Sequence, residues 1–297
     1  MVNDGNFLNT DDIPEKFLDQ ESAYHFFLPL PVNETLKEVF GITENFVRAK
    51  AASKYKDILI YDDFWDEDDD KPILPTYKTN SYGYRSEDWS HGDPGIVTIG
   101  CSDTFGIGQF NDRIWPTLLS KKLNTTSYNL GWPGVSLDYC YKVLKRYLPE
   151  INTNYVFLLT PSIEKLEFYY NDLIGTVSSG GLDELNSSFP LIGKNQAEYL
   201  KKYYLTYYIE RRNIIVNYNK NLDAIKQVCA DNKVKLYTLM NPETGSLGHK
   251  KYFYELFPGH SKGYKGVREY DLAIDCIHRG KIWHWMIAEY FADKMME

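Results

Sequence analysis

The chain has 297 residues, of which 43% are hydrophobic and 25% charged, which suffices for one large α/β domain or a core domain with an extension. Its formal net charge of -8 argues against nucleic-acid binding, which depends on Lys and Arg to neutralise phosphates. No apolar run approaches the roughly 20 residues that span a bilayer, so no membrane association is expected. The first 20 residues are too polar for a signal peptide, and a cytoplasmic protein is therefore expected.

The four cysteines, Cys101, Cys140, Cys229 and Cys276, are scattered and include no CxxC pair. This usage is typical of reduced thiols rather than of a disulfide framework or a structural zinc site. We therefore expect neither a metal ion nor another cofactor.

The first part of the chain lacks a regular alternation of strands and helices. Residues 1–78 are predicted to form an N-terminal extension that packs on the core or docks a partner, and residues 79–297 the main domain. Apolar runs then predict buried strands at 96–100, 127–130, 155–160 and 234–239. Helical spacing predicts helices at 112–123, 137–148 and 281–291, and a long helix or broken pair over 200–229.

The segment 171–195 is rich in Gly, Ser, Asn and Pro and is a candidate lid loop. Alternating strands and helices predict a three-layer α/β/α sandwich with a mostly parallel, flavodoxin-like sheet. Ligands of such sheets bind beyond the carboxyl ends of the strands, which is where functional residues are sought.

Ser102 directly follows the first predicted buried strand, within Gly100-Cys-Ser-Asp-Thr-Phe-Gly106. Its hydroxyl can face the crevice, and backbone N–H groups of the turn can bind a developing oxyanion. A structural turn with a capping serine is the alternative interpretation of this motif alone.

Asp275 lies three residues before His278, just ahead of the last predicted helix. The carboxylate can accept the imidazole Nδ1–H and leave Nε2 to take a proton from a serine, which needs such a base at neutral pH. A surface capping pair is the alternative.

In this order, the motifs resemble those of the GDSL/SGNH hydrolase family over roughly residues 80–291. Gly100–Gly106 is similar to the family's first block, and Asn129-Leu-Gly-Trp-Pro-Gly134 to its second. The resemblance implies Ser102 as nucleophile, Gly134 N–H as an oxyanion donor beside Ser102 N–H, and Asp275 and His278 as the activating pair. Asn80-Ser-x-Gly-x-Arg85 is similar to a segment upstream of the serine in one subset of the family.

Two positions depart from the family pattern. Cys101 stands where the family has an acid, and we interpret it as a small buried thiol rather than a catalytic one. After the third strand, Leu159-Thr-Pro-Ser-Ile-Glu164 lacks the family's asparagine donor. Thr160 or Ser162 is the candidate replacement, with a helix cap as the alternative for Ser162.

Arg85 and Trp132 are candidate substrate contacts, with a structural ion pair as the alternative for Arg85. For His284, packing or a structural contact is favoured over catalysis.

The expected function is cleavage of an ester, with an O-acetyl group on a carbohydrate as the candidate, through an acyl-serine intermediate. The expected partner is a small-molecule or glycan ester. Two alternatives stay open: an O-acyltransferase with the same intermediate, and a non-catalytic binding or virion structural module, which the missing asparagine motivates. An oligomer or assembly partner is compatible with either.

Overall fold

The computed structural model describes residues 34–35, 65–66, 71–89, 92–170, 173–177, 194–241, 273 and 278–297. At their centre lies a four-stranded sheet in which every pairing is parallel, in the order β10-β7-β5-β6. The strands are β5 (Gly95–Ile99), β6 (Thr126–Asn129), β7 (Thr153–Thr160) and β10 (Lys235–Met240). Each lies within two residues of a predicted strand.

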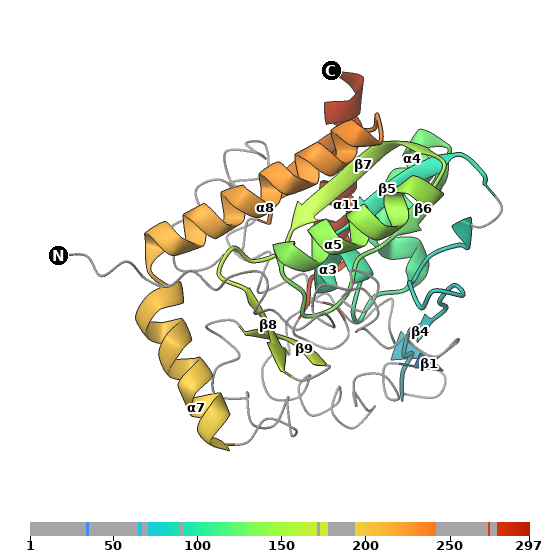
Figure 1. Cartoon of the computed structure of the whole chain (residues 1–297). Helices are drawn as coiled ribbons and strands as arrows, with labels where there is room; N and C mark the ends of the chain where they lie inside the picture. The colour runs from blue at the N-terminus through green and yellow to red at the C-terminus, as the bar shows by residue number, and fades with distance from the viewer. Residues whose placement is uncertain are drawn as a thin grey trace, which may run out of the picture.

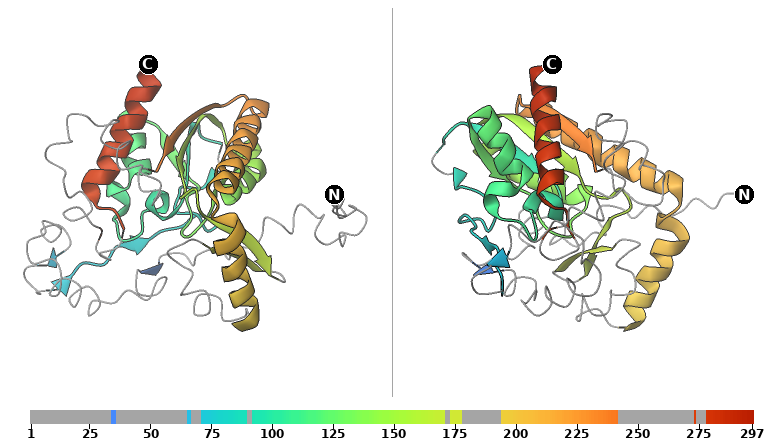
Figure 2. Two further views of the ribbon diagram at one scale, coloured as in Figure 1. Left: turned by 90° about the vertical axis from the view of Figure 1, so that its left-hand side faces the viewer. Right: turned by 180° about the vertical axis from the view of Figure 1, so that it is seen from behind.

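Helices cover both faces of this sheet (Figures 1 and 2). On one face, α4 (Trp115–Leu123) packs against α11 (Lys281–Met296). On the other, α5 (Leu137–Tyr147) packs against α8 (Arg211–Asp231). The predicted α/β/α sandwich with a flavodoxin-like strand order is confirmed. Of the strands in this sheet, the first along the chain, β5, lies between the second, β6, and the third, β7.

The two-residue period of the central strands explains the three layers. In β7, Val156 and Leu158 pack into the core beneath α5 and α8, whereas Phe157 and Leu159 pack into the core beneath α4 and α11. Each of the four is at most 1% exposed. Successive strand residues point to opposite faces, so a continuous apolar run fills both cores at once.

The predicted long helix over 200–229 is broken, as one of the two alternatives anticipated. Helix α7 (Lys194–Tyr203) passes into a π-helical turn, η8 (Tyr204–Tyr208), before α8 begins. Glu210 ends the break: its backbone is extended, and its carboxylate accepts the N–H groups of Arg212 and Asn213. A carboxylate in this N-cap position satisfies amides that lack a partner within the helix.

Part of the predicted lid loop is a strand. β8 (Leu166–Tyr170) and β9 (Leu173–Val177) form an antiparallel hairpin, and α7 begins at Lys194. The pattern Leu173-Ile-Gly-Thr-Val177 was overlooked because its surroundings are turn-forming residues. Residues 178–193 lie outside the described part of the chain, as does most of the segment 1–78, so the domain division remains a prediction.

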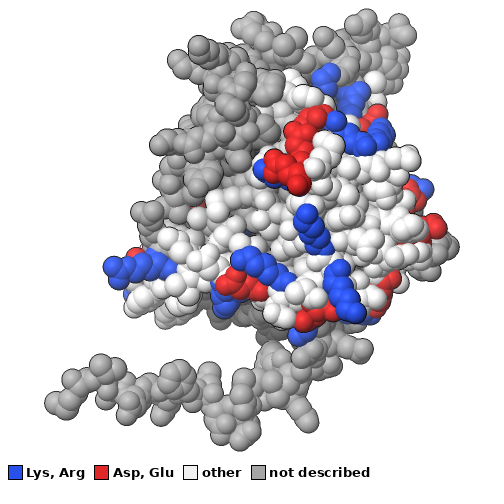
Figure 3. All heavy atoms as spheres, turned by 90° about the horizontal axis from the view of Figure 1, so that it is seen from above, with Lys and Arg blue, Asp and Glu red and all other residues white. Residues whose placement is uncertain are grey.

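Smaller elements complete the described chain. They are β1 (Glu34–Thr35) paired with β4 (Thr76–Tyr77), β2 (Trp65–Asp66) paired with β3 (Lys71–Pro72), α3 (Ser102–Phe105), η5 (Asn111–Arg113) and η6 (Leu148–Glu150). Within the described ranges, no helix has the length and apolarity to cross a membrane. On the face in Figure 3, basic and acidic side chains of the described residues are interspersed rather than gathered by sign.

Candidate active site

The strand order places a topological switch point between β5 and β7, because the connection after β5 carries α4 on one face of the sheet and the connection after β7 carries α8 on the other. We call the space beyond the carboxyl ends of these two strands the crevice. Diverging connections of this kind open a ligand site beyond the carboxyl ends of the two strands. Ser102 follows β5, and Ser162 and Lys165 follow β7, so these residues border the crevice.

Ser102 is the first residue of the short helix α3, and Cys101 is its extended N-cap residue. The N–H groups of Thr104 and Phe105 donate to Cys101 O at 2.9 and 3.0 Å, and Gly106, at φ 83°, ends the helix. Thr104 and Phe105 are fully buried, whereas Ser102 is half-buried. Ser102 is therefore more exposed than the two residues that end this short helix, and its predicted role as nucleophile stays a prediction.

The turn that carries Ser102 lies close to two neighbouring segments, the end of β7 and the loop after β6. A Cβ on Gly100 would lie 2.4 Å from Leu159 O, and one on Gly131 would lie 2.7 Å from Thr104 Cβ. Only glycine fits at these two positions without shifting the turn.

Asn129 joins the Ser102 turn to the loop after β6. Its Nδ2–H donates to Thr104 O at 2.9 Å, and its Oδ1 accepts Gly131 N–H at 2.9 Å. The loop ends at Gly134, whose φ is 77° and beside which a Cβ would meet nothing within 4 Å. The structure thus brings the loop of Gly134 against α3, and the role of the Gly134 N–H as an oxyanion donor stays a prediction.

Arg85 differs from the predicted substrate contact. It is 2% exposed, and its guanidinium donates to Phe105 O, Gly106 O and Gln109 O at 3.1, 2.6 and 2.7 Å. Burial lowers its pKa to about 10. Arg85 is thus a buried clamp on the carbonyls that follow Ser102, and it is neither a substrate contact nor the predicted ion pair.

The segment that holds His278 is hydrogen-bonded, through Arg279, to Gln109, which follows the Ser102 turn. Gln109 is fully buried, and its Nε2–H donates to Arg279 O at 3.1 Å; His278 O accepts Ala273 N–H at 2.9 Å. His278 itself is half-buried. Asp275 lies outside the described residues, so the predicted pairing of Asp275 with His278 stays a prediction.

Thr160, the last residue of β7, is 1% exposed, and its Oγ1 accepts Asn241 N–H at 3.3 Å. This bond joins the ends of β7 and β10. The hydroxyl can still donate its own hydrogen, so the role of Thr160 as an oxyanion donor stays a prediction. Ser162 is half-buried, and its carbonyl accepts Lys165 N–H, so it remains a candidate donor.

Asn241 is a site residue that the sequence analysis missed. It follows β10, and its Nδ2–H donates to Asp103 Oδ2 at 3.1 Å, next to Ser102. The signal was available, because Asn241 directly follows a predicted strand and functional residues were expected at carboxyl ends of strands.

Trp132 is half-buried and packs edge-on against Tyr84 and Phe105, with centroid separations of 5.9 and 6.3 Å. Its ring thus contributes to the core beside the Ser102 turn. Whether it also contacts a substrate stays a prediction.

Lys165 is a second residue that the sequence analysis missed. Its Nζ lies 2.8 Å from Cys101 Sγ, so the two connections that border the crevice touch beside Ser102. Cys101 is buried, as expected, but it is not an isolated thiol. Together with Cys140 and Cys229 it is free of disulfide bonds.

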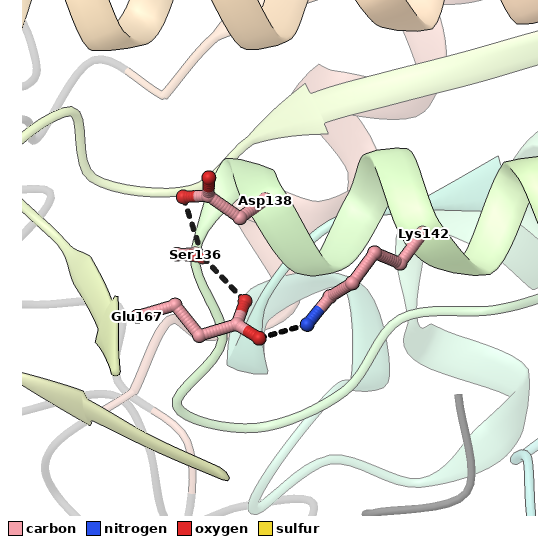
Figure 4. Close-up of polar contacts among 4 residues, drawn as sticks. All are labelled: Ser136, Asp138, Lys142 and Glu167. Atoms are coloured by element: carbon pink, nitrogen blue, oxygen red, sulfur yellow. Dashed lines mark hydrogen bonds and ion pairs between the residues drawn. The ribbon is translucent and has the colours of Figure 1, made fainter. Parts of the chain in front are cut away.

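A buried polar network links the β8–β9 hairpin to the start of α5 (Figure 4). Glu167 on β8 pairs with Lys142 and accepts the hydroxyl of Ser136 at 3.2 Å, while the same hydroxyl lies 3.3 Å from Asp138 Oδ2. The side chains of Glu167 and Lys142 are only 4% and 15% exposed. Burial raises the pKa of Glu167, and Lys142 partly offsets this.

Lys142→Met should lower the free energy of unfolding by about 1–3 kcal/mol at neutral pH, because it leaves a buried carboxylate with one hydroxyl donor. When the pKa of a carboxyl is raised in the folded state, the folded protein becomes less stable as pH rises through that pKa. The difference in the free energy of unfolding between wild type and variant should therefore shrink toward pH 4. Urea unfolding from pH 4 to 8 measures this. Lys226→Met, in an exposed pair with Asp223, is the matched control and should cost little. An equal loss at all pH values would contradict the assignment.

His284 has the structural contact that the sequence favoured. It is 1% exposed on α11, and its Nδ1 accepts Trp115 N–H at 3.2 Å, at the first residue of α4. Burial, followed by the nearby charges of Arg85, His278 and Arg279, lowers its pKa to about 3. The imidazole is therefore neutral and joins two helices of one layer.

His284→Asn should flatten the pH dependence of stability. Between pH 6.5 and about 3 the native protein binds fewer protons at His284 than the unfolded chain, so its stability falls as pH drops. The slope from this group reaches at most about 1.4 kcal/mol per pH unit. Asparagine retains an acceptor but does not titrate, so the wild-type and variant unfolding curves should converge at lower pH. Parallel curves would contradict a neutral His284.

Among the described residues, no group of three or more His, Cys, Asp or Glu side chains could hold a metal ion.

A scan against protein-family models finds no match, and neither does a search of curated proteins. Solved structures that resemble the chain include a putative lipolytic protein of the G-D-S-L family from Desulfitobacterium hafniense, with 15% identity and a TM-score of 0.38, covering 67% of this chain and 98% of that one. The esterase EstA from Pseudoalteromonas sp. has 12% identity and a TM-score of 0.37, covering 69% and 97%. A Clostridium thermocellum family 3 carbohydrate esterase has 16% identity and a TM-score of 0.32, covering 67% and 94%.

Proposed function

We propose that this chain is a serine hydrolase that cleaves an ester through an acyl-serine intermediate on Ser102. The observation that carries the proposal is the position of Ser102, half-buried at the first turn of α3 and at the crevice between β5 and β7. Thr104, on the same turn, is buried and accepts a bond from Asn129 through its carbonyl. The turn is thus rigid where the nucleophile stands, which limits misplacement of the reacting atom.

In the proposed reaction, His278 takes the proton from Ser102 Oγ as the oxygen attacks the ester carbonyl. Asp275 holds the imidazole in the productive tautomer. The N–H groups of Ser102 and Gly134 bind the oxyanion, and His278 returns the proton to the leaving alcohol. Water activated by His278 then releases the acid. A missing side-chain donor costs about 10²–10³ in rate, so we infer a slower enzyme unless Thr160 or Ser162 donates.

The direct test is reaction of the purified full chain with a fluorophosphonate, alongside turnover of a small acetyl ester. Peptide mapping should place the label on Ser102. A label on another serine would overturn the assignment of the nucleophile. Absence of both label and turnover would favour the non-catalytic binding or virion module instead. Product analysis with a glycan acceptor separates hydrolysis from O-acyl transfer, because only transfer yields an acylated sugar.

We propose a carbohydrate ester as substrate. Tyr199, Tyr203 and Tyr207 recur every fourth residue along α7 and η8 and are 74%, 51% and 61% exposed. Tyrosine rings offer an apolar face and a polar edge, which suits sugar rings. Tyr204 and Tyr208 of the same segment are buried and donate to Glu164 O and Lys165 O at the crevice wall.

Replacing Tyr203 and Tyr207 together with alanine should lower kcat/KM on an acetylated polysaccharide by about tenfold, equivalent to roughly 1.4 kcal/mol of lost stacking. Turnover of a small acetyl ester should be unchanged, because these rings are exposed and do not support the Ser102 turn. Val216→Ala, also an exposed apolar position at 65%, is the matched control. Equal losses on both substrates would contradict a glycan-binding role.

A further inference from the structure

The contact between Cys101 and Lys165 joins the two connections at the crevice. Cys101 ends the turn after β5, and Lys165 ends the turn after β7, with Sγ and Nζ 2.8 Å apart. Tyr204 and Tyr208 hold the backbone beneath Lys165 by donating to Glu164 O and Lys165 O at 2.8 and 3.1 Å. The backbone at both residues is thus held in place, that of Cys101 as the N-cap of α3 and that of Lys165 by the two tyrosines.

The two groups share an electrostatic environment that Cys140 and Cys229, the other described thiols, lack. Burial raises the pKa of Cys101, but the charge and hydrogen bond of Lys165, with the Ser102 N–H, outweigh it and leave the pKa lowered. Cys140 and Cys229 are also buried, and burial raises the pKa of each, that of Cys229 to about 12. Because the thiolate is the form that peroxides oxidise, Cys101 should react first.

We propose that Cys101 and Lys165 are a modification site, at which hydrogen peroxide joins Sγ to Nζ through one oxygen atom as a reducible S–O–N bridge. The thiol, the amine and two molecules of hydrogen peroxide give the bridge and three molecules of water. One S–O and one N–O bond form; the S–H bond, one N–H bond and two O–O bonds break. Sulfur and nitrogen each lose two electrons to peroxide.

The geometry favours this product over a direct S–N bond. Two single bonds to a shared oxygen span about the separation that Sγ and Nζ already have, so neither strand end must move. Access is adequate for a molecule as small as peroxide, since Cys101 is 7% exposed and its neighbour Ser102 is half-buried at the crevice. When the thiolate is oxidised by the first peroxide, a hydroxide ion leaves, and it takes a proton from the neighbouring ammonium to give water and the neutral amine.

The bridge would lock the wall of the crevice beside Ser102 and remove the Lys165 charge. We therefore expect Ser102 to lose reactivity toward a fluorophosphonate in proportion to the bridged fraction, and to recover it on reduction. This consequence rests on the proposed function, whereas the bridge itself does not.

Mass spectrometry of the wild-type chain tests the bridge independently of activity. After peroxide treatment and proteolysis without reductant, the peptides that hold Cys101 and Lys165 should appear joined, with their summed mass increased by one oxygen and decreased by two hydrogens. Dithiothreitol should separate them. Cys140 and Cys229 in the same sample are the internal controls and should remain thiols.

Lys165→Arg keeps a positive charge but removes the amine, so the joined species should be absent and Cys101 should proceed to sulfinic acid. Three results in the wild type would overturn the proposal: Cys101 left as a thiol, Cys101 in a disulfide with Cys140, or Cys101 converted to sulfinic acid with Lys165 unmodified. In Lys165→Arg, peptides joined through one added oxygen would overturn it too. Because the wild-type chain decides, a folding defect in the variant leaves the test intact.

Discussion

Ser102→Ala is expected to lower kcat for a small acetyl ester by about 10⁴-fold or more and to abolish fluorophosphonate labelling. The alanine retains the backbone N–H of the first turn of α3, so the oxyanion site and the fold persist while the nucleophilic oxygen is lost. Residual turnover would then come from binding and oxyanion stabilisation alone. Initial rates with excess ester, corrected for spontaneous hydrolysis, measure the effect.

Ser120→Ala is the matched control for this change. Ser120 is also half-buried on a helix, and its hydroxyl donates to Thr117 O at 2.9 Å, within α4. Its loss should leave kcat within about twofold, since a surface substitution away from a site has little effect. Activity of Ser102→Ala equal to that of the Ser120→Ala control would rule out Ser102 as the nucleophile.

Arg85→Met is expected to destabilise the protein by about 4 kcal/mol or more. It removes the guanidinium donors to three buried carbonyls, those of Phe105, Gly106 and Gln109, of which Gly106 O keeps the Gln109 N–H. Each buried acceptor that loses its donor costs about 1–3 kcal/mol. Methionine fills much of the arginine's volume, so the loss reports the hydrogen bonds rather than a cavity. Urea unfolding at neutral pH, where the arginine is charged, measures it.

The same change should lower activity in the protein that remains folded, because the clamped carbonyls directly follow the helix that starts at Ser102. Arg85→Lys should restore little, since an ammonium cannot reproduce the planar fork of donors. Arg146→Met is the control: it breaks an exposed ion pair with Glu150 and should cost less than about 1 kcal/mol. A comparable loss in both variants would show that Arg85 is not a clamp.

Local patterns in the sequence were sufficient for the layers of the fold. The continuous apolar run in Tyr155-Val-Phe-Leu-Leu-Thr160 identifies a strand buried on both faces, and the helical spacing after Leu137 identifies a helix of one layer. These signals are local because side-chain direction repeats every two residues in a strand and every 3.6 in a helix. Ser102 was found for the same reason: it directly follows such a strand.

The sequence did not reveal which residues from distant parts of the chain are in contact near the crevice. Arginine side chains are usually exposed, yet Arg85 is buried against carbonyls some 20 residues later in the chain. Cys101 and Lys165 are 64 positions apart, and Asn241 reaches Asp103 across 138. No local period encodes such pairs, because they arise only when parallel strands from distant parts of the chain end at one edge.

By itself, the sequence determined the α/β/α sandwich, the place of Ser102 directly after a buried strand, and the buried character of His284 and Cys101. The tertiary structure decided that Arg85 clamps the turn, that Thr160 Oγ1 accepts Asn241 N–H, and that Cys101 has a lysine beside it. The physical reason is the same for all three: burial demands a partner for every polar group, and only the folded chain supplies that partner.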